Sequence, residues 1–400
     1  MSRADLTSST SARRLALIGL YFAPGAAIAS WVTRTPAIRD ALGASLAEMG
    51  LVLFGLSGGS MVGILSSGAL VARFGTRPII TAGAFGVVVS MVVIGLGTHL
   101  GSMPLTIVGL AIFGAGMGAA EVAMNVEGGE VERIMGRTFL PLLHGCFSLG
   151  TTAGAVAGIV FASIDFPVLW HLLIVAMVAL AITVPAVRAL PSGVGRSERG
   201  QVRASGSGRE LWRDPRLLLI GVVILAMALA EGSANDWIPL LMVDDFGFDE
   251  GWGSAVFAVF AGAMTIGRFA GGPLVDRFGR PAMLAVSAVS AVVGIAVVSF
   301  TESQAVAVAA IVLWGLGASL GFPVALSAAG ASGPEPARRI ALAATAGYVA
   351  FLVGPPVLGV IGEEVGLRGA LMVPLALAVI GVVASLGTEP RRTVANAQPE

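Results

Sequence analysis

The stretch Gly68-Ala-Leu-Val-Ala-Arg-Phe-Gly75-Thr-Arg77-Pro78 occurs twice in this chain. The second copy reads Gly272-Pro-Leu-Val-Asp276-Arg277-Phe-Gly279-Arg280-Pro281 and repeats the Gly, Leu, Val, Arg, Phe and Gly in the same order. Each copy ends a long apolar segment and is followed directly by another, so each is predicted to be a tight turn between two membrane helices. The repetition indicates a tandem duplication.

The composition is that of a protein with many membrane spans. Hydrophobic residues make up 56% of the chain and charged residues only 12%, whereas about a quarter of a soluble domain is charged. The formal net charge of zero indicates no class of partner. The single cysteine, Cys146, cannot form an internal disulfide.

A membrane helix needs about 20 mostly apolar residues, and twelve such stretches can be placed in the sequence. The predicted spans are 14–36, 48–71, 78–98, 104–128, 139–162, 167–188, 216–241, 251–274, 281–300, 304–328, 340–362 and 369–387. We therefore expect an N-terminal tail (1–13), a six-helix bundle (14–190), a linker rich in Gly, Ser and Arg (191–214), a second six-helix bundle (215–388) and a C-terminal tail (389–400).

The arginines predict the orientation of the chain in the membrane. Twenty of them fall in the tails, the linker and the loops on the same side, and only Arg34, Arg39 and Arg368 fall in the opposite loops. Because cytoplasmic loops carry an excess of basic residues, we expect both tails and the linker to be cytoplasmic, in the inner membrane of a bacterium.

The two repeated turns resemble the signature loop of the major facilitator superfamily of secondary transporters, Gly-x-Leu-x-Asp-Arg-x-Gly-Arg. The second copy fits this pattern closely, whereas the first has Ala72 where the family has aspartate. The resemblance implies an all-α fold of two six-helix bundles related by pseudo-two-fold symmetry, which transports by alternating access. It also implies a cytoplasmic gate formed by Gly68, Arg73, Gly75, Arg77, Gly272, Asp276, Arg277, Gly279 and Arg280.

Ala72 removes the acid from the first gate loop. We expect the latch of the N-terminal half to rest instead on Arg73 and Arg77 with nearby acids, which are Glu127, Glu130 and Glu132.

Ionisable residues at membrane depth are costly and mark functional sites. Glu121 and His144 lie about equally far from the loop around Arg133, so both are predicted at similar depth in the cytoplasmic half. If they meet, a carboxylate beside an imidazole suits a proton-carrying site. The alternative, that His144 only packs or bonds a carbonyl, stays open.

The second half carries further polar residues at depth. Asn235 follows Glu231 by four residues and shares its helix face, which suits a sugar-like or other small polar ligand. Arg268 is expected to pair with Glu121, to bind an anionic substrate or only to lock helices together. Asp236 lies on another face of the same helix. It has either a functional role at membrane depth or a structural role.

These residues give two overlapping sets of predicted site residues. The proton-coupling residues are Glu121, His144 and Glu231. The substrate-binding residues are Tyr21, Glu121, Asn125, Glu231, Asn235, Trp237, Arg268, Trp314 and Tyr348, where the two tyrosines are placed at the cavity by the family resemblance.

Two further patterns concern packing. Glycines at four-residue spacing allow close helix contact at either a static interface or the seam on which the halves slide; they are Gly55, Gly59, Gly63, Gly150, Gly154, Gly158, Gly267 and Gly271. Arg34 either attracts anions into an external vestibule or extends to the membrane interface.

No phosphate loop, Cys/His metal cluster or nucleophile with a base is found in the sequence, so we expect no enzyme and no cofactor, and a proton gradient as energy source. The expected partners are a small-molecule substrate, protons and the lipid bilayer, and we expect no nucleic acid. The protein is expected to be a monomer.

The direction of transport is predicted from helix 5. Its phrase Leu142-Leu-His-Gly-x-Phe-x-Leu-Gly150, together with Glu121, is similar to the fucose-permease-like branch of sugar and proton symporters. Uptake by symport is therefore expected. The alternatives are export of a drug or metabolite by proton antiport, a non-transporting sensor or scaffold, and a membrane enzyme.

Overall fold

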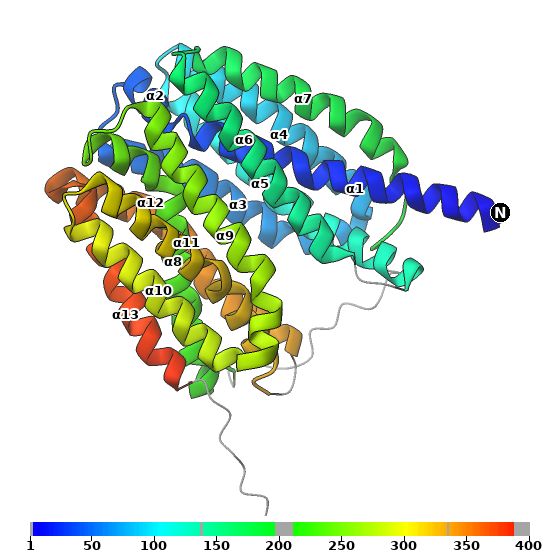
Figure 1. Ribbon diagram of the computed structural model, residues 1–400. Coiled ribbons are helices and arrows are strands. Elements are labelled where there is room, and N and C mark those ends of the chain that lie inside the picture. The colour runs from blue at the N-terminus through cyan, green and yellow to red at the C-terminus, as the bar shows by residue number, and fades with distance from the viewer. Residues whose placement is uncertain (1–2, 137–138, 197–210, 334–335, 388–400) are drawn as a thin grey trace, which may run out of the picture.

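The computed structural model describes residues 3–136, 139–196, 211–333 and 336–387 (Figure 1), and these residues form helices and connecting loops without a strand. Most of the predicted linker (197–210) and the predicted C-terminal tail (389–400) lie outside this part of the chain. The elements are α1 (Arg3–Val32), α2 (Thr35–Leu42), α3 (Leu46–Phe74), α4 (Thr76–His99), α5 (Met103–Met135), α6 (Leu140–Ser163), α7 (Val168–Ala189), the 3-10 turn η1 (Leu211–Arg213), α8 (Pro215–Asp244), α9 (Glu250–Phe278), α10 (Arg280–Phe300), α11 (Gln304–Gly330), α12 (Pro336–Ala370) and α13 (Met372–Leu386).

The predicted membrane spans are confirmed. Eleven of the described helices are long and apolar enough to cross a membrane, and α13 is a shorter apolar helix. The first span departs from its prediction, because α1 begins at Arg3 and so includes most of the predicted N-terminal tail. The short helix α2, which the sequence did not predict, starts after Arg34 and ends at Gly43, whose φ is 60°.

The two halves repeat the same packing, as the duplication predicts. In the first half α5 packs between α3 and α4, and α1 packs on α6 and α7; in the second half α11 packs between α9 and α10, and α8 packs on α12 and α13. Helices α1 to α7 form one bundle and α8 to α13 the other (Figure 1).

The glycine spacing predicts close packing correctly, but the contacts lie within each half and not at the seam between the halves. A Cβ atom on Gly59 would meet the backbone of Ala111 on α5, and one on Gly154 would meet the backbone of Ala26 on α1. The glycines of α9 likewise face α11, where a Cβ atom on Gly267 would meet Ser319. The sliding-surface interpretation is therefore wrong for these residues.

The halves meet through α3 against α12 and α6 against α9. We call the side of the molecule where α1 begins the terminal side, and the side that carries α2 the distal side (Figure 1). Among the described residues, three pairs of residues join the halves by hydrogen bonds on the distal side: Ser254 Oγ donates to Thr33 O at 2.7 Å, Ala47 N donates to Glu363 Oε2 at 3.2 Å, and Arg39 donates to Asp244. The seam is closed on this side.

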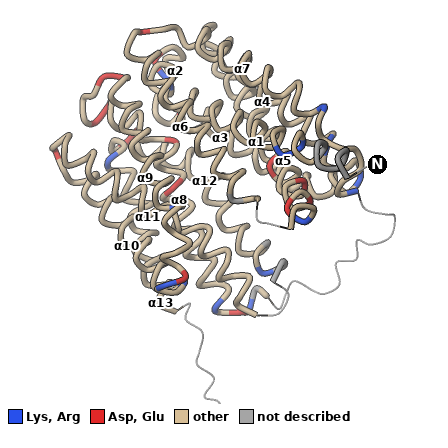
Figure 2. Tube along the Cα trace, turned by 45° about the vertical axis from the view of Figure 1, so that its right-hand side comes forward, with Lys and Arg blue, Asp and Glu red and all other residues tan. Residues whose placement is uncertain are grey.

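Charged residues mark the two ends of the helices. Figure 2 shows red and blue segments mainly at the distal loops and at the terminal side, with few between them. Glu121 and Glu231 lie well inside the spans Met103–Met135 and Pro215–Asp244. Because charge is costly in the hydrocarbon layer, these interior residues define the place to look for a site.

Candidate functional site

The interior charges come together across the seam between the two halves. Glu121 of α5 interacts electrostatically with Arg268 of α9 and with Tyr348 of α12, both in the second half. It also interacts with Tyr21 of α1. These three residues, which the sequence assigned to the same predicted site as Glu121, thus lie within electrostatic reach of Glu121.

On the side of the first half, Tyr21 organises the cluster. Its hydroxyl donates a hydrogen bond of 2.8 Å to Asn125 Oδ1, and its ring packs edge-to-face on His144 with a centroid distance of 5.4 Å. The residue is 2% exposed, so this phenol has the partner that a buried hydroxyl needs. His144 in turn interacts electrostatically with Arg268.

On the side of the second half, Arg268 pairs with Glu231. The distance from Arg268 Nη2 to Glu231 Oε1 is 2.9 Å, and the side chains are 41% and 13% exposed. The sequence had proposed Glu121 as the partner, and the structure instead gives the hydrogen bond to Glu231 and leaves Glu121 within electrostatic reach. The guanidinium of Arg268 thus interacts with two carboxylates, one from each half.

The described hydrogen bonds include none between Glu121 and His144, which the sequence had suggested as a pair. The physical reason lies in the packing, since α6 packs chiefly on α1 and only slightly on α5. Tyr21 of α1 therefore meets His144, and equal depth on neighbouring helices was not enough to pair the acid with the imidazole.

The two tryptophans do not fit the predicted binding role. Trp314 is fully buried, donates from Nε1 to Ala230 O at 3.1 Å and packs edge-on against Phe260. Trp237 is also fully buried in the hydrophobic core. Both side chains stabilise the second bundle from within, whereas Asn235 remains partly exposed one turn beyond Glu231.

The two predicted gate loops share one backbone conformation. Gly75 ends α3 with φ 85° and ψ 172°, and Gly279 ends α9 with φ 81° and ψ 158°, a left-handed φ that favours glycine. The guanidinium of Arg73 lies 5.0 Å from the ring centroid of Phe74 in the first loop. Arg277 lies 5.3 Å from that of Phe278 in the second.

The acids near the first loop find other partners than the sequence predicted. Glu127 is fully buried and accepts hydrogen bonds of 2.6 Å from Arg13 Nε and from Thr76 Oγ1, so it does not pair with Arg73 or Arg77. The sequence missed Arg13 because it placed this residue in a polar tail.

The other two predicted latch acids act locally. Glu130 pairs with Arg133, three residues along the same helix, at 2.6 Å. Glu132 Oε2 accepts hydrogen bonds from the backbone N–H groups of Phe139 and Leu140 at the start of α6. Neither acid reaches a gate arginine.

Arg34 is buried at the distal end of the first bundle. It is 3% exposed and donates from Nη2 to Phe166 O at 2.8 Å. Its two predicted roles, attraction of anions into an external vestibule and extension to the membrane interface, stay predictions.

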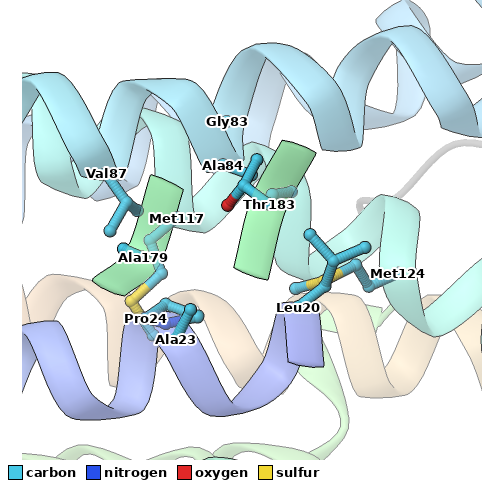
Figure 3. Close-up of a pocket in the computed structure, with 11 residues that line it drawn as sticks. Leu20, Ala23, Pro24, Gly83, Ala84, Val87, Met117, Met124, Ala179 and Thr183 are labelled. Atoms are coloured by element: carbon cyan, nitrogen blue, oxygen red, sulfur yellow. The ribbon is translucent and has the colours of Figure 1, made fainter. Parts of the chain in front are cut away.

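A small cavity of about 20 Å³ lies inside the first bundle, behind the helices that carry Tyr21 and Glu121. Its walls are almost entirely apolar side chains from α1, α4, α5 and α7 (Figure 3), namely Leu20, Ala23, Pro24, Gly83, Ala84, Val87, Met117, Ala120, Met124, Ala179 and Thr183. This volume holds about one water molecule, so the cavity is too small for a substrate.

Comparisons with known proteins agree with this architecture. The family description "Major Facilitator Superfamily" matches residues 16–336. An uncharacterised MFS-type transporter of Yersinia pestis is 29% identical over 344 residues, which cover 86% of this chain and 87% of the relative.

Two solved transporters share the fold. The nucleoside transporter NupG, in a mutant form, superposes with a TM-score of 0.78 at 14% identity over 94% of this chain and 100% of its own. A variant of the fucose:proton symporter FucP of E. coli superposes with a TM-score of 0.63 at 17% identity over 94% and 98%. Since the family match covers most of the sequence, this chain belongs to the Major Facilitator Superfamily of membrane transporters.

Proposed function

We propose that this transporter takes up a small polar solute, sugar-like or another organic molecule, together with protons. The observation that carries the proposal is the single arginine, Arg268, which lies between two carboxylates of different halves, Glu231 by a hydrogen bond and Glu121 by electrostatic interaction. A site of this kind ties the charge state of an acid to the contact between the two bundles.

The coupling follows from the number of charges. When Glu121 holds a proton, Arg268 neutralises Glu231 and the cluster carries no net charge. When Glu121 is ionised, two carboxylates compete for one guanidinium in a medium that screens charge poorly, and one acid is left without a counter-ion. Proton release therefore changes the force between α5 and α9, which are the helices that must separate or approach during alternating access.

Polar groups around this cluster can bind the solute. Asn125, Asn235 and Tyr348 are partly exposed, and they supply amide and phenol groups that bond hydroxyls. The names of two transporters with the same fold refer to a nucleoside and to fucose with protons, and both ligands are rich in hydroxyl groups. These names support a hydroxylated solute for this chain as well.

The closed distal seam bears on which side of the membrane the site faces in this conformation. If the arginine-rich terminal side is cytoplasmic, as the charge distribution predicts, the seam between the halves is sealed toward the outside. The conformation is then inward-facing, in the inner membrane of a bacterium. Such a state releases solute into the cell in a symport cycle.

The test uses purified protein in proteoliposomes, with a ligand first found by thermal shift among sugars, nucleosides, organic acids and drugs. With Glu121→Gln we expect no proton-driven accumulation, whereas exchange of pre-loaded solute continues. The matched control is Glu130→Gln, which removes an acid at the end of the same helix. Unchanged accumulation in Glu121→Gln would refute the coupling role. If the solute moves only in the direction opposite to the flow of protons, the protein is an antiporter and export replaces symport.

A further inference from the structure

Asp236 is an acid within the span Pro215–Asp244 that the proposed mechanism does not use. The residue is partly exposed. Among the described residues its carboxyl group has no hydrogen bond, ion pair or neighbouring charge. The structural role that the sequence left open requires such a partner, and the described part of the chain supplies none.

Asp236 lies on a different face of α8 from the central cluster. Five residues separate it from Glu231, which places the two side chains about 140° apart around the helix. Gly232 lies one turn before Asp236 on the same face, and a Cβ atom there would meet the ring of Phe351 on α12. Asp236 therefore faces α12, whereas Glu231 faces Arg268 on α9.

The charges nearest along α8 are already paired. Glu231 is bound by Arg268 and Asp244 by Arg39. The helices that pack on α8, which are chiefly α9, α11, α12 and α13 with smaller contacts from α1 and α2, bring no charged side chain within electrostatic reach of Asp236 in the ranges that the structure describes. No described cation of the protein neutralises this acid.

The helix α12, which packs on α8, carries backbone oxygen atoms that lack helical donors. Pro355 and Pro356 lie inside α12, and because proline has no N–H, the carbonyl groups of Phe351 and Leu352 lose their helical donors. Freed carbonyls of broken helices, together with carboxylates, are the groups that bind Na⁺ or a proton in secondary transporters.

We propose that Asp236 is a second cation site, which takes a monovalent cation, H⁺ or Na⁺, independently of the cluster formed by Glu121, Arg268 and Glu231. The physical reason is that a lone carboxylate at membrane depth is costly, and a bound cation removes this cost. The site rests on the proposed transport function and adds one positive charge to the cargo of each cycle.

The test needs no solute, so its failure is separate from a failure of the proposed function. We would measure the unfolding temperature of the purified full chain in detergent, first as a function of pH without sodium and then as a function of NaCl at alkaline pH, with choline chloride as the salt control. A cation bound only by the folded protein raises this temperature. The variants are Asp236→Asn, Asp236→Ser and, as matched control, Glu364→Gln, which removes an exposed acid of α12.

We expect the wild type and Glu364→Gln to gain stability with protons, with sodium or with both, and both Asp236 variants to lose that gain. A response to pH alone assigns the site to a proton, and a response to sodium at fixed pH assigns it to sodium. Equal responses in wild type and the Asp236 variants would overturn the proposal. If the Asp236 variants do not fold, the wild type alone gives the answer. A wild type whose unfolding temperature responds to neither ion overturns the proposal. The proposal is supported if the wild type shows the infrared band of a neutral carboxylic acid, if this band disappears at alkaline pH or with sodium, and if it persists in Glu121→Gln.

Discussion

The distal seam gives the sharpest prediction about conformation. Arg39 of α2 holds Asp244 of α8 through both carboxylate oxygens, with an Nη2 to Oδ1 distance of 2.9 Å. The two side chains are 18% and 25% exposed. Asp244→Asn keeps the shape of the side chain and removes the charge, so we expect the seam to open more often.

The magnitude follows from the geometry. An exposed ion pair contributes about 0.2 to 1 kcal/mol, and hydrogen bonds to charged groups contribute about 1.5 to 3 kcal/mol. A bidentate pair that is mostly but not fully buried lies between these values, at about 1 to 2 kcal/mol. A change of this size alters the ratio of closed to open molecules by about 5- to 30-fold.

Distances between spin labels on the two halves would measure this shift. Cys146 is the single cysteine of the sequence, so Cys146→Ser gives a cysteine-free background for labels at the exposed positions Ala41 on α2 and Ala305 on α11. We expect a longer-distance population to grow in Asp244→Asn.

The matched control is Asp40→Asn. Asp40 contacts the same arginine through one oxygen at 3.3 Å and is 65% exposed, so its removal should change the distances little. The charge swap Arg39→Asp with Asp244→Arg should restore the closed population. Unchanged distances in Asp244→Asn, or an equal shift in Asp40→Asn, would refute this account of the seam.

Three further predictions concern the site and the stability of the bundles. In Glu231→Gln, Arg268 keeps Glu121 as its remaining carboxylate partner, and binding of the identified solute should weaken by tenfold or more, about 1.4 kcal/mol. Calorimetric titration would measure the affinity, and an unchanged value would place the solute elsewhere. Hydrogen bonds from Arg339 and from the N–H groups at the start of α8 outweigh the effect of burial and hold the pKa of the Asp214 carboxyl below its usual range. At a pH above the unfolded-state pKa, Asp214→Ala should therefore lower the free energy of unfolding by about 1 to 2 kcal/mol. A lowered pKa contributes stability that is lost as the pH falls through the folded-state pKa, so the difference in unfolding temperature between variant and wild type should shrink in acid. A difference independent of pH would contradict this prediction. Ala179→Val should fill the cavity of the first bundle and stabilise it by at most about 1 kcal/mol. A lower unfolding temperature would show that the cavity cannot accept the two added methyl groups.

The sequence predicted the elements of the fold well because each depends on local chemistry. The apolar spans follow from the thickness of the membrane, and the two gate turns follow from glycines that adopt positive φ at Gly75 and Gly279. The duplication seen in these turns then fixed the repeat of six spans. The prediction failed at α2 and at the start of α1, where short polar helices lie next to membrane spans and carry no strong apolar period.

The candidate site was predicted in part for the same reason. The cost of charge in the membrane singles out Glu121, Glu231 and Arg268 from the sequence alone. Spacing along a helix also places Asn235 on the face of Glu231. The tryptophans misled the prediction, since an indole beside polar residues in the sequence can still turn into the bundle core, as Trp314 does.

What the sequence by itself determined is the depth of each residue and the helix face on which it lies. Only the tertiary structure decided which neighbour that face meets: that Arg268 bonds Glu231, that Glu127 bonds Arg13, and that the glycines at four-residue spacing pack within each half. The physical reason is that depth and face follow from the fixed rise and turn of one helix. Contacts between helices depend on how whole bundles pack, and no local pattern records that arrangement.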